Sequence, residues 1–541
     1  MKKTFSQKKK TMPLLRNPQF GFVRALCREF PLAEVFLVGG AVRDMLLSRP
    51  TKDYDFVVRN VPITALLRFF KKHGTVRLVG KKFGILKFLP KMSKMGSGTE
   101  RGQAQIRFAK LSQTPPEPDP VFDIALPRTE HTDAGTGHYR DFQIKTDHRL
   151  PIEEDLSRRD FTINALALNL KTREVIDPFG GVADIKKKII RTVGKPQARF
   201  AEDYSRILRA VRFACQLGFQ IEQETLEVIR KKAKFLNKEM APEKRLTKKI
   251  DRNTMRVVAY EIIAREIVKT FVADPVRALD MYDDLGIIKL LIPELLTMKG
   301  CPQEKRWHSE GDVWTHTRLA LSVLAGKKFA NEFGEKNNSA LLTFAVLFHD
   351  AGKPSTLQTP ETHGTDRIRT HGHDRAGAEI ARHVADRLRL ASAAEFDGTA
   401  DDLAWLVRNH LLVLTTTVDK LRSRTIEKYF YDDPRRGALL QRLVFCDSSA
   451  SIQESGRVGI QGYYAFKKRR HAFEKQHNLT LRKHALPPPL LDGDAIMRIC
   501  AIKPGPRVGE LRELLREEQL SGRIKTRRQA GAWLRCNGAQ S

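Results

Sequence analysis

Short apolar runs alternate with helical stretches between residues 34 and 180. Apolar runs of this length, bounded by glycine, proline and polar residues, predict β-strands, and their mixture with helices is typical of a compact α/β or α+β domain. The predicted strands are VFLVGG (35–40), DYDFVV (53–58), TVRLVG (75–80), GILKFL (84–89), VFDIAL (121–126) and EVIDPF (174–179).

The pattern changes at two places. Residues 91–120 are polar, punctuated by glycine and proline, and too many for a hairpin loop, so we expect a mobile insertion there. After residue 180 the apolar positions recur with helical spacing, for example in 206–219 and 274–296. The sequence therefore predicts a mixed head followed by helices.

Composition narrows the class of protein. A chain of 541 residues is too long for one core and indicates three or four domains, and 41% hydrophobic residues suffice to fill them. No apolar stretch approaches the roughly 18 residues of a membrane span, and the N-terminus lacks the apolar core of a signal peptide. The six cysteines form no C-x-x-C pair, which fits a reducing compartment. We expect a soluble, cytoplasmic protein without contact to a membrane.

The net charge of +33 indicates a polyanionic partner, most simply nucleic acid. Basic residues are concentrated in 231–252, in 465–484 and near the C-terminus. Phe466, Phe473 and Trp533 lie among them and offer either stacking surfaces for bases or the apolar faces of ordinary helices; for each one singly, the second interpretation is favoured.

The segment FLVGGAVRDMLLSRPTKDYDFVV (36–58) carries the strongest candidate chemistry. Residues i and i+2 of a strand share a face, so Asp53 and Asp55 would present two carboxylates to Mg²⁺. The turn at Gly39 and Gly40 can offer backbone N–H groups to a triphosphate. Together these are parts that phosphoryl transfer requires, although a D-x-D pair alone is more often a turn or a solvated strand face.

Further along the chain, Asp123 could supply a third carboxylate to this site, and Arg128 could bind phosphate. The run RRDFTINA places Arg159, Asp160 and Asn164 in one short segment. It offers forked donors for phosphate oxygens and an amide for a ribose hydroxyl, or else a structural set of the same residue types.

Asp203 and Arg206 stand three residues apart in a predicted helix and would share a face. They would present an acceptor beside a fork of donors. This pattern matches the Watson–Crick edges of cytosine and adenine, which show an amine beside a ring nitrogen, and mismatches guanine and uracil. The alternative is an ion pair on the surface of the helix.

The motifs GGAVRD with DYD, RRDFTINA, DPFGG and EDYSRILRAVRF, in this order, resemble the class II tRNA nucleotidyltransferase and bacterial poly(A) polymerase family. The resemblance implies an α+β fold in which a polymerase-β-like α/β head is followed by an all-helical neck, body and tail. It also implies catalytic Asp53, Asp55 and Asp123, with Mg²⁺ on the first two. Nucleotide-binding roles are implied for Gly39, Gly40, Arg43, Arg128, Arg159, Asp160, Asn164, Asp203, Arg206 and Arg209.

The segments WHSEGDVWTH (307–316), LFHDAGKP (347–354) and THGHDRAG (370–377) resemble an HD-type metal-dependent phosphohydrolase. The resemblance implies that His316, His349, Asp350 and Asp447 hold one divalent transition metal, with His373 and His410 available for a second. A degenerate domain kept as an RNA-binding body is the alternative. The implied domains are a basic leader (1–33), the head (34–180), a neck and body with a nucleotide-templating helix (181–300), the HD domain (301–455) and a basic RNA-binding tail (456–541).

Three functions follow in order of preference. The first is template-independent addition of C and A, from CTP and ATP, to the 3′ end of tRNA. The second is poly(A) addition to RNA by the same head. The third is an HD phosphohydrolase whose head serves only for RNA binding, which the presence of Asp53 and Asp55 disfavours. The sequence does not distinguish full CCA addition from addition of CC or A alone.

Overall fold

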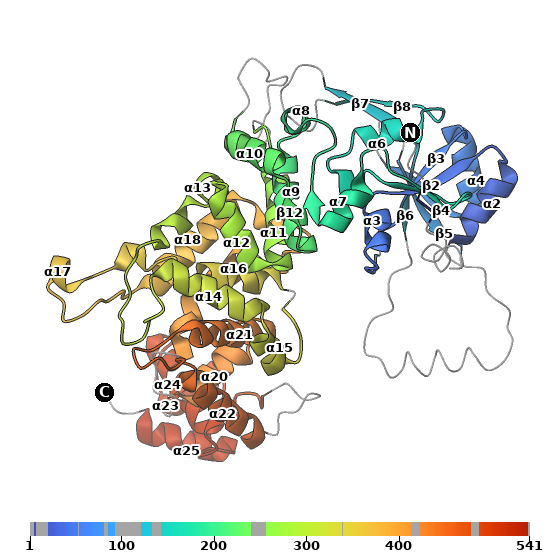
Figure 1. Ribbon diagram of the computed structural model, residues 1–541. Coiled ribbons are helices and arrows are strands. Elements are labelled where there is room, and N and C mark those ends of the chain that lie inside the picture. The colour runs from blue at the N-terminus through green and yellow to red at the C-terminus, as the bar shows by residue number, and fades with distance from the viewer. Residues whose placement is uncertain are drawn as a thin grey trace. The chain divides into compact units, whose positions relative to one another are not determined.

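The computed structural model describes residues 5–6, 20–51, 53–79, 85–91, 121–132, 142–239, 256–337, 339–413, 421–477 and 486–538. The chain divides into two compact units, Met1–Ala259 and Tyr260–Ser541 (Figure 1). Within the described residues, no helix combines the length and the hydropathy needed to cross a membrane. The predicted insertion at 91–120 lies outside the described residues except for Lys91. Residues 240–252 of the basic stretch 231–252 also lie outside them.

The first unit contains a mixed sheet of eight strands in the order β1-β10-β9-β2-β3-β6-β5-β4. Only β3 and β6 pair in parallel; the other neighbours in this sheet pair antiparallel. The strands are β1 (Phe5–Ser6), β2 (Glu34–Val38), β3 (Asp55–Arg59), β4 (Gly74–Val79), β5 (Ile85–Pro90), β6 (Phe122–Ala125), β9 (Ala167–Asn169) and β10 (Glu174–Ile176). A separate hairpin joins β7 (Arg128–Thr132) and β8 (Phe142–Thr146).

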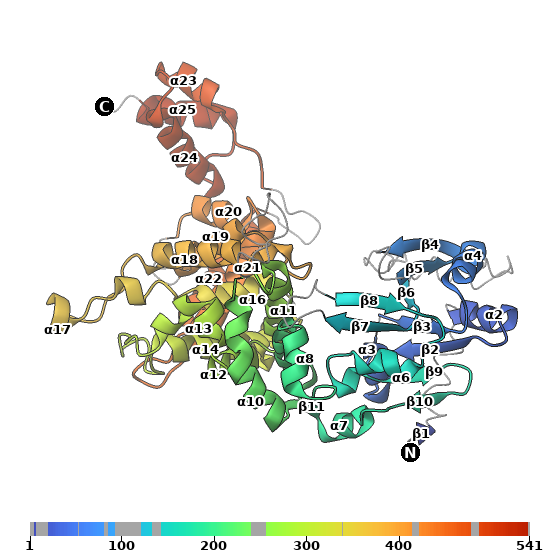
Figure 2. The same ribbon diagram turned by 90° about the horizontal axis from the view of Figure 1, so that it is seen from above.

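The two faces of this sheet are covered by different helices. One face is covered by α2 (Gly21–Glu29) and α4 (Ile63–His73) (Figure 2). Phe22 of α2 and Phe70 of α4 contact each other, and both rings contact Phe88 of β5. On the other face, α6 (Ile152–Ser157) packs against strand residues such as Phe36 and Val57. Strand residues alternate between the faces, so every second side chain enters each core.

Short helices complete the first unit, most of them after β10 in the sequence. They are α3 (Gly40–Leu46), η2 (Thr162–Asn164), α7 (Gly181–Lys187), α8 (Pro196–Glu202), α9 (Ser205–Leu217), α10 (Gln223–Lys232) and η3 (Ala233–Asn237). Two very short strands, β11 (Ile189–Ile190) and β12 (Gln220–Ile221), pair in parallel between them. Asp177 accepts hydrogen bonds from the backbone N–H groups of Gly181 and Val182 and so caps α7, as expected for a structural residue.

The described part of the second unit contains helices without a multi-residue strand. Its first part comprises α11 (Tyr260–Ala273), α12 (Pro275–Asp284), α13 (Ile287–Leu291), η6 (Pro293–Met298), α14 (Val313–Ala325), α15 (Lys327–Phe333), α16 (Ala340–Phe348), α17 (Pro360–His363), α18 (His373–Arg387), α19 (Ala400–Asn409), η9 (His410–Val413) and α21 (Pro434–Ala450). Every residue of α16 is buried, because its sequence ALLTFAVLF is apolar on all sides. The helix therefore forms the centre around which α14, α18, α19 and α21 pack.

The remaining helices are α20 (Ser423–Phe430), α22 (Gln461–Gln476), α23 (Gly493–Cys500), α24 (Pro506–Leu520) and α25 (Arg527–Asn537). Phe466 and Phe473 of α22 are buried, so their rings belong to the core. Trp533 of α25 packs against the apolar cluster of α23–α25. The α/β head and helical remainder confirm the predicted fold class, whereas the division into five named domains stays a prediction.

Candidate active sites

Three strands bring two carboxylates together at one edge of the head sheet. β2 ends at Val38, and β3 begins beside it at Asp55, so these two residues are paired. On the other side, Asp55 is in register with Asp123 of the parallel strand β6. Carboxylates in register on adjacent parallel strands present their oxygens side by side, in the manner that Mg²⁺ binding requires.

Asp53 lies outside this strand. The pairing of β3 with β2 begins only at Asp55, and Asp53 precedes it in an exposed irregular segment. The prediction that Asp53 and Asp55 share a strand face is therefore wrong. Partial desolvation, together with the carboxylates of Asp123 and Asp53, raises the pKa of Asp55, while Arg159 opposes this effect. The three carboxylates therefore lie close enough for their charges to interact.

Lys87 adds a cation to the same edge. It lies on β5 opposite Asp123, and its Nζ is 2.9 Å from Asp123 Oδ1. Both side chains are roughly half exposed, so this ion pair is readily exchanged for other partners. Asp123 therefore pairs with the Lys87 ammonium group and also lies in register with Asp55.

The glycine turn follows β2 directly and opens α3. Gly39 has φ +71°, and a Cβ atom there would lie 2.6 Å from Nη1 of Arg159. The positive φ favours glycine, and a Cβ atom would also require the Arg159 guanidinium to shift. Gly40 begins α3, and Val38, which directly precedes the turn, pairs with Asp55.

A buried polar network joins α3 to α9 behind this turn. Arg43 Nη1 donates to Asn164 Oδ1 at 2.7 Å, and Asn164 Nδ2 donates to Asp160 Oδ1 at 3.2 Å. Arg209 of α9 donates from Nε and Nη2 to Asp160 Oδ2 at 2.8 and 2.5 Å. Although burial works to raise it, Arg209 holds the pKa of Asp160 far below its usual value. Asp160 is thus an ionised hub that fixes the two helices.

Asp155 organises the predicted phosphate-binding arginines. Its buried carboxylate accepts from Arg158 at 2.7 Å, from Arg159 at 3.3 Å and from the backbone N–H of Arg128 at 3.3 Å. Burial would raise the pKa of Asp155, but Arg158 and Arg159 hold it below the usual value. Arg159 is thereby directed between Asp155 and the Gly39 turn, so three predicted parts of the head, Arg128, Arg159 and the Gly39–Gly40 turn, lie around Asp155.

The predicted Asp203–Arg206 pair takes a different form. Asp203 lies between α8 and α9 in an extended conformation, and its carboxylate accepts from Ser205 N at 2.8 Å. The two residues therefore do not share a helix face, because the first helix ends before Asp203. Arg206 is buried and forms an ion pair with Glu202, at 2.5 Å between Nη1 and Oε2. A further bond joins Arg206 Nη2 to Arg158 O at 3.3 Å, so the guanidinium is held in a fixed orientation.

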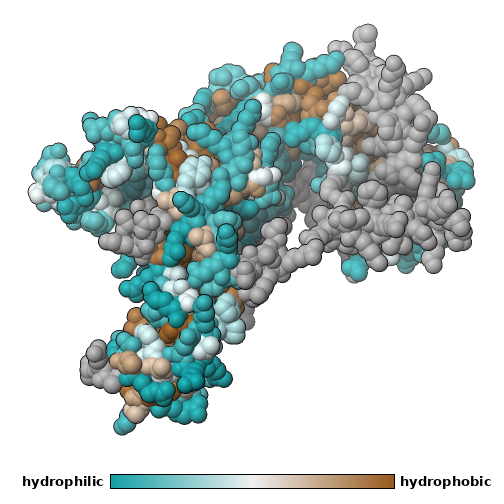
Figure 3. All heavy atoms as spheres, turned by 90° about the horizontal axis from the view of Figure 1, so that it is seen from below, coloured by the Kyte–Doolittle hydropathy of each residue, from teal (hydrophilic) through white to brown (hydrophobic). Residues whose placement is uncertain are grey.

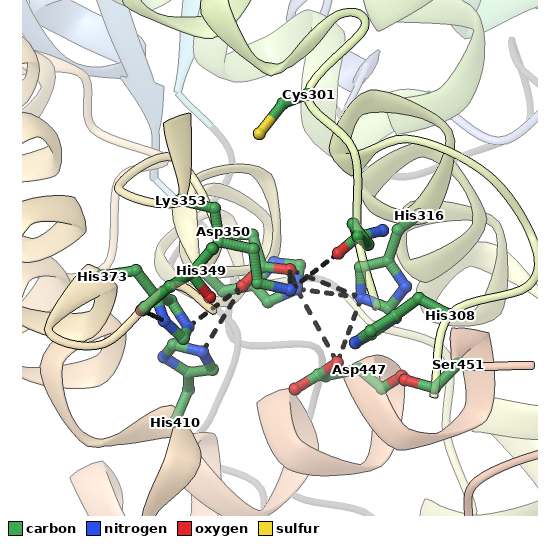
Figure 4. A network of polar contacts seen from close by, with 12 residues as sticks. Cys301, His308, His316, His349, Asp350, Lys353, His373, His410, Asp447 and Ser451 are labelled. Carbon is green, nitrogen blue, oxygen red and sulfur yellow. Dashed lines mark hydrogen bonds and ion pairs between the residues drawn. The ribbon is translucent and has the colours of Figure 1, made fainter. Parts of the chain in front are cut away.

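The second unit gathers four histidines around Asp350 (Figure 4). Each histidine has its Nδ1 directed to an oxygen: His316 to Glu310 at 2.7 Å, His349 to Val346 O at 2.8 Å, His373 to Thr370 O at 2.7 Å and His410 to Val407 O at 2.6 Å. Such bonds place the proton on Nδ1 and leave the lone pair of a neutral imidazole on Nε2. All four Nε2 atoms lie within 3.3 to 3.7 Å of an Asp350 carboxylate oxygen.

The four histidines form two groups, one on each oxygen of Asp350. His316 and His349 face Oδ2, where Asp447 Oδ1 also lies 3.1 Å from His316 Nε2. His373 and His410 face Oδ1, at 3.4 and 3.7 Å. Asp350 therefore stands between the two histidine groups, and its Oδ2 also lies 2.7 Å from Lys353 Nζ.

Chemical complementarity tests whether these residues fit a metal. The Nε2 atoms of His373 and His410 are buried and have no hydrogen-bond partner. A buried lone pair without a donor is costly unless it binds a cation. Imidazole nitrogen combined with carboxylate oxygen suits a divalent transition metal. The residues of both groups therefore fit a divalent metal.

Two known protein families match parts of this chain. The family described as Poly A polymerase head domain matches residues 35–191, and the HD domain family matches residues 313–441. The chain is 32% identical over 388 residues to the A-adding tRNA nucleotidyltransferase of Deinococcus radiodurans, covering 71% of this chain and 79% of that protein. The chain belongs to the tRNA nucleotidyltransferase family. A second relative in this family, the Multifunctional CCA protein of Stenotrophomonas maltophilia strain K279a, is 30% identical over 434 residues, or 79% of this chain and 87% of that protein.

Solved structures of CCA-adding enzymes share the fold of this tRNA nucleotidyltransferase. The Bacillus stearothermophilus enzyme in complex with CTP has a TM-score of 0.57 at 19% identity, over 98% of each chain. The Thermotoga maritima enzyme complexed with tRNA has a TM-score of 0.55 at 18% identity, over 99% of this chain and 100% of the other. At this identity the likeness concerns the fold.

Several residues of the head site and of the histidine site were not predicted from the sequence. They are Asp155 and Glu202, which hold arginines, Lys87, which binds Asp123, and Glu310 and Lys353, which contact the histidine site. Asp155, Glu202 and Lys353 pair with residues three or four positions away, so the spacing of charges along the chain gave a local signal for them. Lys87 and Glu310 meet partners that are distant in the sequence.

For this tRNA nucleotidyltransferase we expect Arg206→Ala to lower the preference for C and A over G and U by roughly tenfold or more, because a base left with unpaired polar groups loses about 1–3 kcal/mol. The measurement is kcat/KM for each of the four nucleotides on a tRNA primer. Arg230→Ala on the exposed side of α10 is the matched control. Unchanged selectivity in Arg206→Ala would mean that base selection takes place elsewhere.

The histidine site predicts a pH-dependent metal affinity. Burial would lower the pKa of His316, but acceptors on both sides, Asp447 and Glu310, raise it to about 9 in the metal-free protein. A metal needs the Nε2 lone pair, so binding below this pKa must release a proton. We expect affinity for Co²⁺ to rise with pH, by about tenfold per unit from about pH 6.5 to about pH 8.5. Calorimetry across this range checks the slope, and a flat profile would contradict the assignment.

Proposed function

We propose that the protein adds C and A nucleotides, without a nucleic-acid template, to the 3′ end of tRNA by Mg²⁺-dependent transfer from CTP and ATP. The observation that carries the proposal is the register of Asp55 with Asp123 beside the Gly39–Gly40 turn. This edge combines carboxylates for metal with backbone N–H groups for phosphate. It occurs in a chain that shares 32% identity with an A-adding tRNA nucleotidyltransferase.

The residues of the head have distinct proposed tasks. Asp53, Asp55 and Asp123 would hold Mg²⁺, which when bound neutralises the triphosphate and activates the primer hydroxyl. We expect the Gly39–Gly40 turn, Arg43, Arg128 and Arg159 to orient the phosphates for in-line attack, and Asn164 with Asp160 to recognise a ribose hydroxyl. In this scheme the new phosphodiester joins the primer 3′ oxygen to the α-phosphorus, and pyrophosphate leaves.

Base selection is proposed to rest on Arg206 and Asp203, with Arg209 fixing the helix on which Arg206 lies. Glu202 and the carbonyl of Arg158 restrain the Arg206 guanidinium before a nucleotide arrives. A preorganised donor fork favours bases that present a matching edge and rejects bases whose polar groups stay unpaired. Asp203 is held at the start of α9 through Ser205 and supplies the acceptor.

A basic surface in the C-terminal part of the chain is proposed to hold tRNA. Lys467, Lys468, His471 and Lys475 are exposed on α22. Of its aromatic residues, Tyr463, Phe466 and Phe473 are buried and Tyr464 is exposed. On the face drawn in Figure 3, hydrophilic residues predominate and the hydrophobic ones gather in smaller patches. Exposed lysines contact phosphates without reading sequence, which suits a substrate recognised by shape.

A second activity, metal-dependent phosphohydrolysis, is proposed for the HD domain. It rests on the convergence of four imidazole Nε2 atoms on Asp350, with Asp447 completing one group. Divalent transition metals bound there would polarise a phosphoryl oxygen and supply hydroxide at neutral pH. The intact ligand set disfavours the alternative of a degenerate HD body kept for RNA binding.

Poly(A) addition is the second candidate for the head, because the family that matches residues 35–191 is named for poly A polymerases. Primer choice separates the two functions. We expect kcat/KM with ATP on a tRNA ending in CC to exceed that on an unstructured oligo(A) primer by at least about 100-fold. Equal use of both primers would favour poly(A) addition instead.

A further inference from the structure

Glu310 is a buried carboxylate in the segment between η6 and α14. Its side chain is 1% exposed. Oε1 accepts from His316 Nδ1 at 2.7 Å and from His308 Nδ1 at 2.8 Å, and Oε2 accepts from Ile452 N at 2.8 Å. The carboxylate thus has three donors around it and no need of a further partner.

We propose that Glu310 is the positioning residue of the HD metal centre, which orients His316 and strengthens it as a ligand. The inference rests on the proposed metal binding of this domain. A histidine binds a metal through one nitrogen and is oriented by the acceptor at the other. His349, His373 and His410 use backbone carbonyls for this purpose, whereas His316 uses the carboxylate of Glu310. A carboxylate makes the imidazole a better electron donor than a carbonyl does.

Glu310 also connects His316 to the chain segment that follows Asp447, the second proposed acidic ligand. Asp447 lies on α21, and Ile452, whose N–H binds Glu310, follows the end of that helix. One carboxylate therefore fixes the ring of His316 on α14 and the chain just beyond α21. The distance of 3.1 Å between His316 Nε2 and Asp447 Oδ1 depends on both.

A purely structural role for Glu310 makes a different prediction. The same chain segment is fastened by Ser309, whose N–H donates to Ile452 O at 2.7 Å and whose Oγ donates to Ile452 O and Gln453 O at 3.0 Å each. Ser309→Ala weakens this fastening without touching His316. It is the matched control for Glu310→Gln, which keeps the size of the side chain but removes its charge.

The experiment titrates the metal-free full-length protein with Co²⁺, followed by calorimetry and by the visible absorption of imidazole-bound Co²⁺. We expect Glu310→Gln to bind about 10- to 100-fold more weakly than the wild type, with shifted absorption bands, while Ser309→Ala stays within about twofold. Hydrolysis by Glu310→Gln should recover as Co²⁺ is raised. Wild-type affinity in Glu310→Gln, or an equal loss in Ser309→Ala, would overturn the positioning role.

The same titration separates this inference from the function on which it rests. Failure of the wild type to bind Co²⁺ with imidazole bands would refute the HD metal centre itself. If Glu310→Gln does not fold, Glu310→Asp serves as the second test of the positioning role. This variant keeps the charge but shortens the side chain by one methylene, so metal affinity should fall about tenfold. Unaltered affinity and absorption in a folded Glu310→Asp protein would overturn the proposal.

Discussion

Replacement of Asp55 or Asp53 by alanine should reduce nucleotide incorporation by about 10³-fold or more while leaving tRNA affinity unchanged. Each carboxylate belongs to a site where metal binding stabilises developing charge by several kcal/mol, and each 1.36 kcal/mol is a factor of ten in rate. The effect should be larger for Asp55, which is in register with Asp123. Single-turnover incorporation and a tRNA-binding titration measure the two quantities.

The control for these carboxylates is Glu174→Gln, which alters an exposed acid on β10 of the same sheet. It should retain the wild-type rate. Retained incorporation in Asp55→Ala would refute the assignment of the head site, and loss of tRNA affinity together with the rate would point to a folding defect instead.

The double variant His349→Ala with Asp350→Ala should abolish phosphohydrolase activity and leave nucleotide incorporation intact. Asp350 faces both histidine groups, so its removal takes a ligand from each proposed metal position. Hydrolysis of bis(p-nitrophenyl) phosphate with added Co²⁺ measures one activity, and incorporation into tRNA measures the other.

His383→Ala is the matched control for the HD site, because His383 is exposed on α18, the helix that His373 begins. Its hydrolysis should equal that of the wild type. Undiminished hydrolysis in the double variant would place the activity outside the HD cluster, and a parallel loss of incorporation would point to a folding defect.

The sequence predicted the elements and motifs that depend on local pattern. The six apolar runs correspond to β2, β3, β4, β5, β6 and β10, and the Gly39–Gly40 turn follows β2 as expected. Two local extrapolations were wrong for the same reason. Spacing of two or three residues implies a shared face only within one regular element, and Asp53 precedes β3 while Asp203 separates α8 from α9.

Contacts between residues that are far apart in the sequence could not be predicted from such local patterns. Lys87 meets Asp123, and Glu310 meets Ile452, through pairings of strands and loops far apart in the sequence. The convergence of the four histidines on Asp350 was expected only through the resemblance to HD domains, because helix packing places them together and spacing along the chain does not. The hub role of Asp160 likewise needed the docking of α9 to be seen.

The most direct test of the central claim is the sequence of RNA 3′ ends after reaction. Transcripts of tRNA ending at the discriminator base, at C and at CC are incubated with all four nucleotides and Mg²⁺, alongside an oligo(A) primer. We predict that only C and A are added to the tRNA, that each product ends at CCA, and that oligo(A) is not extended. Long adenosine tails, or addition of G and U, would contradict the account.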